Sequence, residues 1–440
     1  MKRISIITCV FILLHLQAIA ENYPYRSNIL WVTTPNHSDW LYETGETATI
    51  SLSVYEYGIP LDGQEVIFTI ANDCLEPDKK GSIKLKNGKA EINIGTMKKP
   101  GFRDCNLTIK RNGNTYNHHV KVGFSPEKIT PYTTMPVDFD LFWKENLEQQ
   151  AILPMKPEVV FVEEFSSDKI DCYLVKLQCY KPGQYVYGYL TKPKKEGKYP
   201  VVVSPPGAGI KPMNPLKTIF YAENGFIRFD MEIHGINPAM DAESYKNISA
   251  TFGGHNANGY LANGIHTRDT YYLKRVYLAC VRAVDYLCSL PEWDGINLAT
   301  QGGSQGGALA LMLAGLDSRI TACVANHPAL SDMAGYAEIG RTGGYPHFGR
   351  KYQNIQLTPE VINTLSYYDV VNFARRITVP VFLTWGFNDN VCPPTTSYAV
   401  YNVLSSPKEA LITPINEHWT TMETHYQQMA WIKKQLKLHP

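Results

Sequence analysis

The chain has 440 residues, more than one typical domain, and its 44% hydrophobic and 19% charged residues are those of an ordinary folded protein. Its formal net charge of +1 provides no electrostatic attraction for nucleic acid or for an acidic membrane surface. We therefore expect neither a nucleic-acid partner nor a membrane partner.

Residues 1–20 have the pattern of a secretory signal peptide. Lys2 and Arg3 form a basic head, and residues 4–16 form an apolar run that is too short for a transmembrane helix. Residues 18–20, Ala-Ile-Ala, then fit a cleavage site. The pattern predicts export, either to the periplasm or out of the cell.

Residues 25–125 are predicted to form a small all-β domain. Residues 49–55, for example, alternate between apolar and polar side chains. Asn-Gly pairs predict two hairpins, over residues 83–94 around Asn87-Gly88 and over residues 107–122 around Asn112-Gly113. Several short strands at this spacing are typical of an immunoglobulin-like sandwich.

Two pairs of residues in this domain leave alternatives open. Cys74 and Cys105 could form a disulfide bond in an exported protein, or remain two thiols. Trp31 and Trp40 could present a platform for carbohydrate or belong to the core. The eight cysteines beyond the signal peptide contain no C-x-x-C pair, so we expect no zinc ribbon.

Strands and helices alternate in the rest of the chain, as a mostly parallel sheet requires. A proline-punctuated linker is predicted at residues 126–137, and an α/β domain at residues 138–440. Residues 330–365 lack a strand pattern, and we expect them to be an insertion that caps the active site. Tyr336 and Tyr345 in this insertion are candidates for contacts with substrate.

The most informative motif is Gly302-Gly303-Ser304-Gln305-Gly306-Gly307, which lies between a short apolar run and a helix-forming stretch. This order of strand, sharp turn and helix is how an α/β-hydrolase presents a serine nucleophile. Gly302 and Gly306 would be required because the strand and the helix pass too close for a Cβ. The alternative is a glycine-rich or phosphate-binding turn, but the motif lacks the P-loop and dinucleotide-binding patterns.

The partners of Ser304 follow in the order expected of this fold, acid and then base. Asp389 follows the predicted strand 379–385, and His418 follows the predicted strand 410–415, so both lie at the edge of the sheet where catalytic groups gather. His418 would take the serine proton, and Asp389 would orient the imidazole. Less well-placed candidates are His327 and His234 for the base, and Asp369 and Glu417 for the acid.

An oxyanion hole is also expected. One donor would be the backbone N–H of Gln305, the residue after the nucleophile. The second would come from the glycine-rich loop after the predicted strand 201–204, with Ala208 favoured and Gly207 as the near alternative. This loop could instead be an ordinary Pro/Gly turn.

Over roughly residues 138–440 the sequence resembles the acetyl xylan esterase and cephalosporin-C deacetylase family of α/β-hydrolases. The matching motifs lie at residues 138–143, 264–265, 270–276, 302–307, 365–374 and 389–394. The resemblance implies that Ser304, Asp389 and His418 are the catalytic residues and that the second oxyanion donor lies near Ala208. It implies a deacetylase of short oligosaccharides that needs no metal or cofactor, and it allows a homo-oligomer, because family members often form ring-like hexamers.

The sequence departs from the family pattern at two places beside the predicted site. His234-Gly235-Ile236 stands where the family usually has Arg-Gly-Gln, and Trp419 stands where a glutamate usually follows the catalytic histidine. Both departures bear on the range of substrates.

The sequence thus predicts a secreted serine esterase that removes acetyl groups from acetylated plant oligo- or polysaccharides through an acetyl-enzyme. One alternative is a serine peptidase of the prolyl oligopeptidase type, but about 100 β residues are too few for a propeller of several four-stranded blades. Another is a carbohydrate-binding protein with a vestigial hydrolase domain, which the complete Ser304, Asp389 and His418 set argues against.

Overall fold

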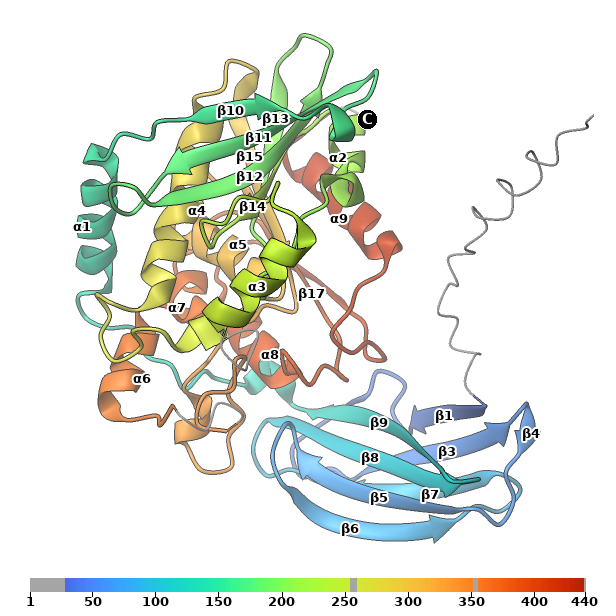
Figure 1. The fold of residues 1–440 in the computed structure, drawn as a ribbon. Helices are drawn as coiled ribbons and strands as arrows, with labels where there is room; N and C mark the ends of the chain where they lie inside the picture. The colour runs from blue at the N-terminus through green and yellow to red at the C-terminus, as the bar shows by residue number, and fades with distance from the viewer. Residues whose placement is uncertain (1–27, 254–258, 351–354, 439–440) are drawn as a thin grey trace, which may run out of the picture.

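The computed structural model of the protein describes residues 28–253, 259–350 and 355–438. A smaller part built from strands lies at the N-terminal end, against a larger part that contains a long sheet and most of the helices (Figure 1). The predicted signal peptide, residues 1–20, lies outside the described residues. No helix among the described residues is long and apolar enough to cross a membrane.

The N-terminal part consists of two sheets that share one core. The first contains β1 (Ile29–Pro35), β3 (Ala48–Glu56), β4 (Ile59–Pro60) and β7 (Lys89–Gly95). The second contains β2 (Leu41–Tyr42), β9 (Asn114–Phe124), β8 (Gly101–Arg111), β5 (Glu65–Asn72) and β6 (Pro77–Lys84), in that order. Alternate residues such as Ile50 and Leu52 of β3 pack against Leu107 and Val120 of the facing sheet.

One of the two predicted hairpins is confirmed and the other is wrong. β8 and β9 form an antiparallel hairpin whose turn residues Asn112 and Gly113 both have positive φ, 48° and 76°. Asn87-Gly88 also forms a tight turn, but its flanking strands do not pair, because β6 pairs with β5 and β7 with β3. The chain crosses from one sheet to the other here, through the buried Leu85.

The proposed bond between Cys74 and Cys105 is not formed. Cys105 points into the core between the two sheets and is fully buried. The Sγ of Cys74 lies instead 3.6 Å from the Oδ1 of Asn390, in the larger part of the molecule. Trp31 and Trp40 are both half-buried against the core of the N-terminal part, and Trp31 stacks on the ring of His118.

The larger part is organised around a nine-stranded sheet within the described residues. In spatial order its strands are β10 (Glu158–Phe161), β11 (Ile170–Gln178), β12 (Tyr185–Pro193), β14 (Ile227–Glu232), β13 (Tyr199–Ser204), β15 (Trp293–Gly303), β16 (Ala322–Asn326), β17 (Val381–Trp385) and β18 (Lys408–Ile412). The pairs from β14 to β18 are parallel, whereas the pairs from β10 to β14 are antiparallel. The expectation of a mostly parallel sheet is confirmed.

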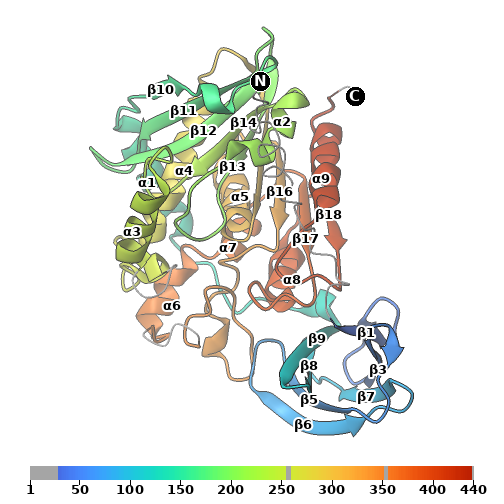
Figure 2. The same ribbon diagram turned by 45° about the vertical axis from the view of Figure 1, so that its right-hand side comes forward.

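Helices cover both faces of this sheet (Figure 2). The helices are α1 (Phe139–Ile152), α2 (Phe220–Glu223), α3 (Ala242–Gly253), α4 (Tyr272–Cys288), α5 (Gln305–Leu316), α6 (Pro359–Ser366), α7 (Val370–Ala374), α8 (Pro394–Val403) and α9 (Met422–Gln435). Val201 and Val203 of β13 pack on the side of α4 and α5, whereas Val202 packs on the side of α2 and α9. This alternation, with both faces apolar, explains why the strand is a continuous valine run.

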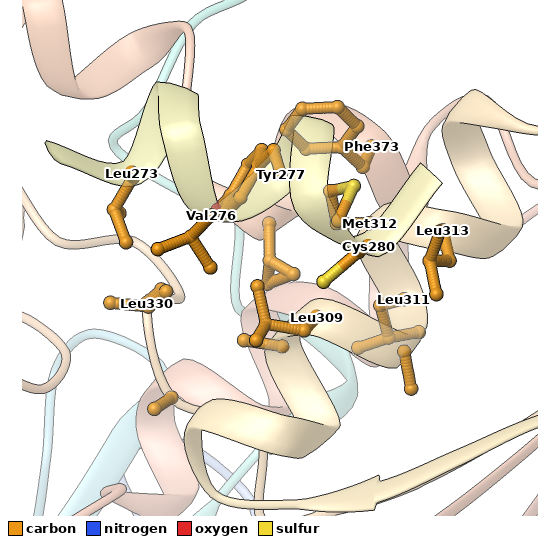
Figure 3. Packing of buried hydrophobic residues seen from close by; sticks show 14 of the residues in the cluster. Leu273, Val276, Tyr277, Cys280, Leu309, Leu311, Met312, Leu313, Leu330 and Phe373 are labelled. Carbon is orange, nitrogen blue, oxygen red and sulfur yellow. The ribbon is translucent and has the colours of Figure 1, made fainter. Parts of the chain in front are cut away.

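The helix that follows the nucleophile motif is held by apolar contacts around much of its surface. Figure 3 shows Leu309 and Met312 of α5 facing Val276 and Cys280 of α4, with Phe373 of α7 at one end of the contact. All of these side chains are buried. The end of β15 and the start of α5 are therefore set in a rigid core.

Residues 330–365 contain no strand among the residues described there, which exclude 351–354. The segment holds the short helical turn η6 (Gly335–Ala337) and α6. Several of its side chains reach the N-terminal part. Lys99 pairs with Glu338, Arg350 pairs with Glu76, and the Thr342 hydroxyl donates to the carbonyl oxygen of Asp73.

Candidate active site

Ser304 occupies a sharp turn between β15 and α5. Its φ of 58° and ψ of −123° lie in a region that a residue with a Cβ rarely adopts. Its amide donates to the carbonyl oxygen of Asn326, at 3.0 Å, and its own carbonyl accepts from Ala308 in the first turn of the helix, also at 3.0 Å. Strand, turn and helix thus hold the strained serine from both sides.

Gly302 and Gly306 lie where the chain segments are closest. A Cβ on Gly302 would lie 2.3 Å from the carbonyl oxygen of Gly306, and a Cβ on Gly306 would lie 2.3 Å from that of Pro205. Real Cβ atoms do not approach backbone this closely, so neither position accommodates a side chain without movement of the backbone.

The structure brings Ser304, His418 and Asp389 into one chain of hydrogen bonds. The Nε2 of His418 lies 3.0 Å from the Oγ of Ser304, and its Nδ1 lies 2.7 Å from the Oδ2 of Asp389. Asp389 follows β17, and His418 follows β18, so both loops leave the same edge of the sheet as Ser304. This geometry allows His418 to accept the serine proton while Asp389 holds the opposite side of the ring.

The surroundings of Asp389 keep its carboxylate charged. The residue is fully buried, and burial alone would raise its pKa, but the hydrogen bond with His418 and the neighbouring imidazoles hold the pKa below its usual value. The second carboxylate oxygen, Oδ1, accepts the amides of Val391 and Cys392 at 2.7 and 2.8 Å. An ionised acid next to Nδ1 fixes the imidazole with its lone pair on Nε2, towards the serine.

His327, one of the weaker candidates for the base, lies beside His418 with the ring centroids 4.3 Å apart. Burial and, to a smaller extent, the neighbouring His418 lower the pKa of His327 to about 4, so His327 is neutral near pH 7. Nitrogen or oxygen atoms of His327, Asp389 and His418 lie within 4.8 Å of one another, close enough to bind a cation. Both ring nitrogens of His418 already face Asp389 and Ser304, however, so a cation would have to displace one of these contacts.

The other weaker candidates lie away from the hydrogen-bond chain. Asp369 caps α7 and accepts amides of the 332–333 turn, and burial beside Asp332 raises its pKa. Glu417 is largely exposed and pairs with His119 of the N-terminal part. His234 bonds the hydroxyl of Tyr272 through Nδ1 at 2.7 Å, and burial lowers its pKa to about 3.

The predicted oxyanion donors lie on either side of the nucleophile turn. Gln305 is fully buried at the start of α5, and Gly207 is close enough to the turn that an added Cβ would lie 3.7 Å from the carbonyl oxygen of Gly303. The loop that carries Gly207 and Ala208 follows β13, the neighbour of β15 in the sheet.

Sequence reasoning missed Tyr260, which links these two elements. Its hydroxyl accepts the amide of Gly209 at 3.1 Å and donates to the Oε1 of Gln305 at 2.8 Å. Tyr260 lies in a short helical turn, η5 (Gly259–Ala262), and is fully buried. No local motif marks it, because its partners lie about 50 residues away along the chain.

Tyr336 and Tyr345, the two candidates for contacts with substrate, both lie beside His347. The hydroxyl of Tyr336 lies 2.8 Å from the Nδ1 of His347, and the Nε2 of His347 lies 2.9 Å from the carbonyl oxygen of Val391. Tyr336 therefore supports the Asp389 loop through His347. Tyr345 is buried, with its ring edge-on to the ring of His347.

Comparisons with known proteins agree with this geometry. The model of the acetyl xylan esterase (AXE1) family matches residues 126–435. The acetyl esterase Axe7A of Xylanibacter ruminicola is 58% identical over 439 residues, which cover 99% of this chain and 98% of the relative. Together they identify this chain as a carboxylic-ester hydrolase.

Two solved structures share the fold of the larger part. An acetyl xylan esterase from Paenibacillus sp. R4 is 29% identical, with a TM-score of 0.62 over 70% of this chain and 98% of its own. Acetyl xylan esterase 1 from Thermoanaerobacterium sp. JW/SL YS485 is 24% identical, with a TM-score of 0.59 over 70% of this chain and 97% of its own. With the match of the family model and the 58% identity to Axe7A, the chain belongs to the acetyl xylan esterase family.

Proposed function

We propose that this esterase releases acetate from acetylated xylo-oligosaccharides, with Ser304 as nucleophile, His418 as general base and acid, and Asp389 as the residue that orients the imidazole. The continuous Ser304–His418–Asp389 contact, at 3.0 and 2.7 Å, carries the proposal. The names of the solved relatives and of the family support xylan as the parent polysaccharide.

The first half-reaction transfers the acetyl group to the enzyme. The Oγ of Ser304 attacks the acetyl carbonyl carbon as the Nε2 of His418 takes its proton, and a tetrahedral oxyanion forms. The ester bond then breaks, and His418 gives the proton to the departing sugar oxygen. The imidazolium formed between these steps is stabilised by the buried carboxylate of Asp389.

The second half-reaction regenerates the serine. Water attacks the acetyl-enzyme as His418 takes one of its protons, and the serine oxygen leaves with that proton as acetate is released. In both tetrahedral intermediates the oxyanion would be held by the amides of Gln305 and of Ala208 or Gly207. Each such donor contributes on the order of 3 kcal/mol to the stabilisation of the transition state.

We also propose the finer features of the molecule that the residues suggest. Residues 138–440 would form an α/β-hydrolase domain joined by the linker 126–137 to an immunoglobulin-like domain at 25–125, and two sheets over one core support the latter. The pattern of residues 1–20 supports export.

The acyl intermediate provides the test. The enzyme is mixed with acetylated xylo-oligosaccharides, quenched in acid within milliseconds and digested with a protease. The mass of the peptide that contains Ser304 is then measured by mass spectrometry. We expect one added acetyl group on Ser304 and release of acetate into solution. Acetylation elsewhere would contradict the role of Ser304, and binding of xylan without release of acetate would favour the carbohydrate-binding alternative.

A further inference from the structure

The outer face of β9 in the N-terminal part meets both loops that carry partners of Ser304. His119 and Lys121 are two residues apart, so they lie on one face of the strand, whereas Val120 faces the core. Lys121 contacts the Asp389 loop, and the Nε2 of His119 lies 3.3 Å from an oxygen of Glu417, next to His418. Figure 1 shows β9 on the side of the N-terminal part that faces α8.

Lys121 makes the more specific of these contacts. Its side chain is fully buried, and its Nζ lies 2.7 Å from the Oδ1 of Asp73 and 2.7 Å from the backbone carbonyl oxygen of Asp389. Its backbone N–H donates to the Oδ1 of Asn388 at 2.9 Å. One residue therefore fixes both the main chain of Asp389 and the side chain just before it.

The ion pair also secures the far end of the same loop. The Oδ2 of Asp73 accepts the hydroxyl of Thr395 at 2.8 Å and its amide at 3.3 Å, in the first turn of α8. Between these two anchors lie the amides of Val391 and Cys392, which hold the Oδ1 of Asp389. The position of the carboxylate is thus determined by a loop whose two ends are bonded to the N-terminal part.

A joint between two parts of a chain does not need a buried charge for stability. Buried ion pairs are often no more stabilising than apolar side chains of similar size, because each charge loses its hydration. Apolar contact is also available here, since Phe102 packs edge-on against Phe387 with the ring centroids 5.0 Å apart. Although burial favours the neutral amine, the negative charge of Asp73 raises the pKa of Lys121 and keeps it protonated.

We propose that Lys121 is a positioning residue for catalysis. Together with Asp73 it holds the Asp389 carboxylate against His418 from outside the larger part of the molecule. This inference rests on the proposed function, in which Asp389 orients the catalytic histidine. The residues matched by the family model begin at 126, so both members of the ion pair come from the region that precedes the family match. The N-terminal part is therefore a structural component of the active site.

The test uses the full-length chain and the variant Lys121→Met with Asp73→Asn, which removes both charges and leaves neither buried alone. We expect kcat for acetate release to fall about 10- to 100-fold, because displacement of a catalytic group by about 1 Å has effects of this order. KM should change less than about twofold, because the ion pair does not touch the substrate. Thermal unfolding must remain cooperative for the comparison to hold.

A double-mutant cycle separates positioning from general loss of stability. In the Asp389→Asn background the ion-pair variant should cost less than about twofold further in kcat, because the carboxylate through which it acts is already gone. The proposal would be overturned if the ion-pair variant lost 10- to 100-fold in kcat in the Asp389→Asn background as well. It would also be overturned if the ion-pair variant kept the wild-type kcat while Asp389→Asn was impaired. Wild-type kcat for Asp389→Asn itself would instead refute the proposed triad.

A matched control and a milder variant complete the design. Arg111 and Glu56 form an ion pair of 2.6 Å in the N-terminal part. Arg111 is seven residues along β8 from Asp104, the residue opposite Lys121, which is about 23 Å at the spacing of a strand. Arg111→Met with Glu56→Gln should leave kcat unchanged. If the Lys121 variant does not fold, Thr395→Val decides, because loss of its hydroxyl from Asp73 should lower kcat with KM unchanged, and an unaltered kcat would refute the proposal.

Discussion

A close backbone approach in the active site predicts the effect of a single added methyl group. Gly306→Ala would place a Cβ 2.3 Å from the carbonyl oxygen of Pro205 and 3.1 Å from the carbonyl carbon of Pro206. Carbon and oxygen atoms in contact lie about 3.5 Å apart, so the two segments must separate by about 1 Å. Pro205 and Pro206 lead directly into Gly207 and Ala208, the proposed second oxyanion donors.

This displacement should affect catalysis more than folding. A shift of about 1 Å in a catalytic group costs on the order of 100-fold, so we expect kcat/KM for 4-nitrophenyl acetate and for acetylated xylo-oligosaccharides to fall by that factor. Overpacking costs about 1–3 kcal/mol, so the variant should still fold, with a lower unfolding temperature. Steady-state kinetics and thermal unfolding measure the two effects separately.

Gly303→Ala is the matched control from the same motif. Its Cβ would lie 3.6 Å from the Cβ of Asn326 and 3.6 Å from the Nε2 of His327, which are ordinary contact distances. We expect Gly303→Ala to unfold at the wild-type temperature and to lose far less activity than Gly306→Ala. Equal kcat/KM for Gly306→Ala and the wild type would refute the argument from the close approach.

Two further predictions concern pH and redox conditions. Burial alone would lower the pKa of His119, but the bond to Asp104 outweighs burial and raises the pKa in the folded state above 6.5. The bond therefore stabilises the fold fully below pH 6.5. Its contribution is lost as the pH rises through the folded-state pKa. Urea unfolding should therefore show His119→Gln to be less stable than wild type at pH 5.5, with a deficit that shrinks as the pH is raised. A deficit that grows with pH would contradict this. Because no bond joins Cys74 and Cys105, dithiothreitol should leave the unfolding temperature unchanged, whereas a clear decrease would reveal a disulfide bond.

The parts of the fold that local sequence controls were predictable. The apolar runs that precede Ser304, Asp389 and His418 do become β15, β17 and β18, three parallel strands of one sheet with β16 between the first two. Once these strands are parallel, their carboxyl ends must lie at one edge, and the three side chains meet there. A periodic pattern and the order of elements were sufficient for this inference.

The sequence was insufficient where distant segments decide the structure. The turn at Asn87-Gly88 formed as its residues require, yet its flanking strands joined different sheets because the core that buries Leu85 lies between them. Cys74 turned towards Asn390, more than 300 residues further along the chain, and away from Cys105. Spacing in sequence cannot reveal either partner.

Tyr260 and Lys121 were missed for the same reason. Tyr260 is marked neither by a motif nor by a neighbouring catalytic residue, and its role as a link between Gly209 and Gln305 appears only in three dimensions. Lys121 lies in a strand of alternating polar and apolar residues, where a lysine is normally exposed. The only local sign of its burial would have been a carboxylate partner, and Asp73 is 48 residues away.

The most direct test of the central claim is acetate release from acetylated xylo-oligosaccharides by the wild type and by Ser304→Ala. Removal of the nucleophile should lower kcat by about 10⁶-fold, because alanine has no hydroxyl that could attack the acetyl group and give its proton to His418. The Ser304→Ala protein should unfold close to the wild-type temperature, because the positive φ of Ser304 is equally strained for alanine and only the half-buried hydroxyl that contacts His418 is lost. Release of acetate by Ser304→Ala within tenfold of the wild-type rate would show that the chemistry lies elsewhere.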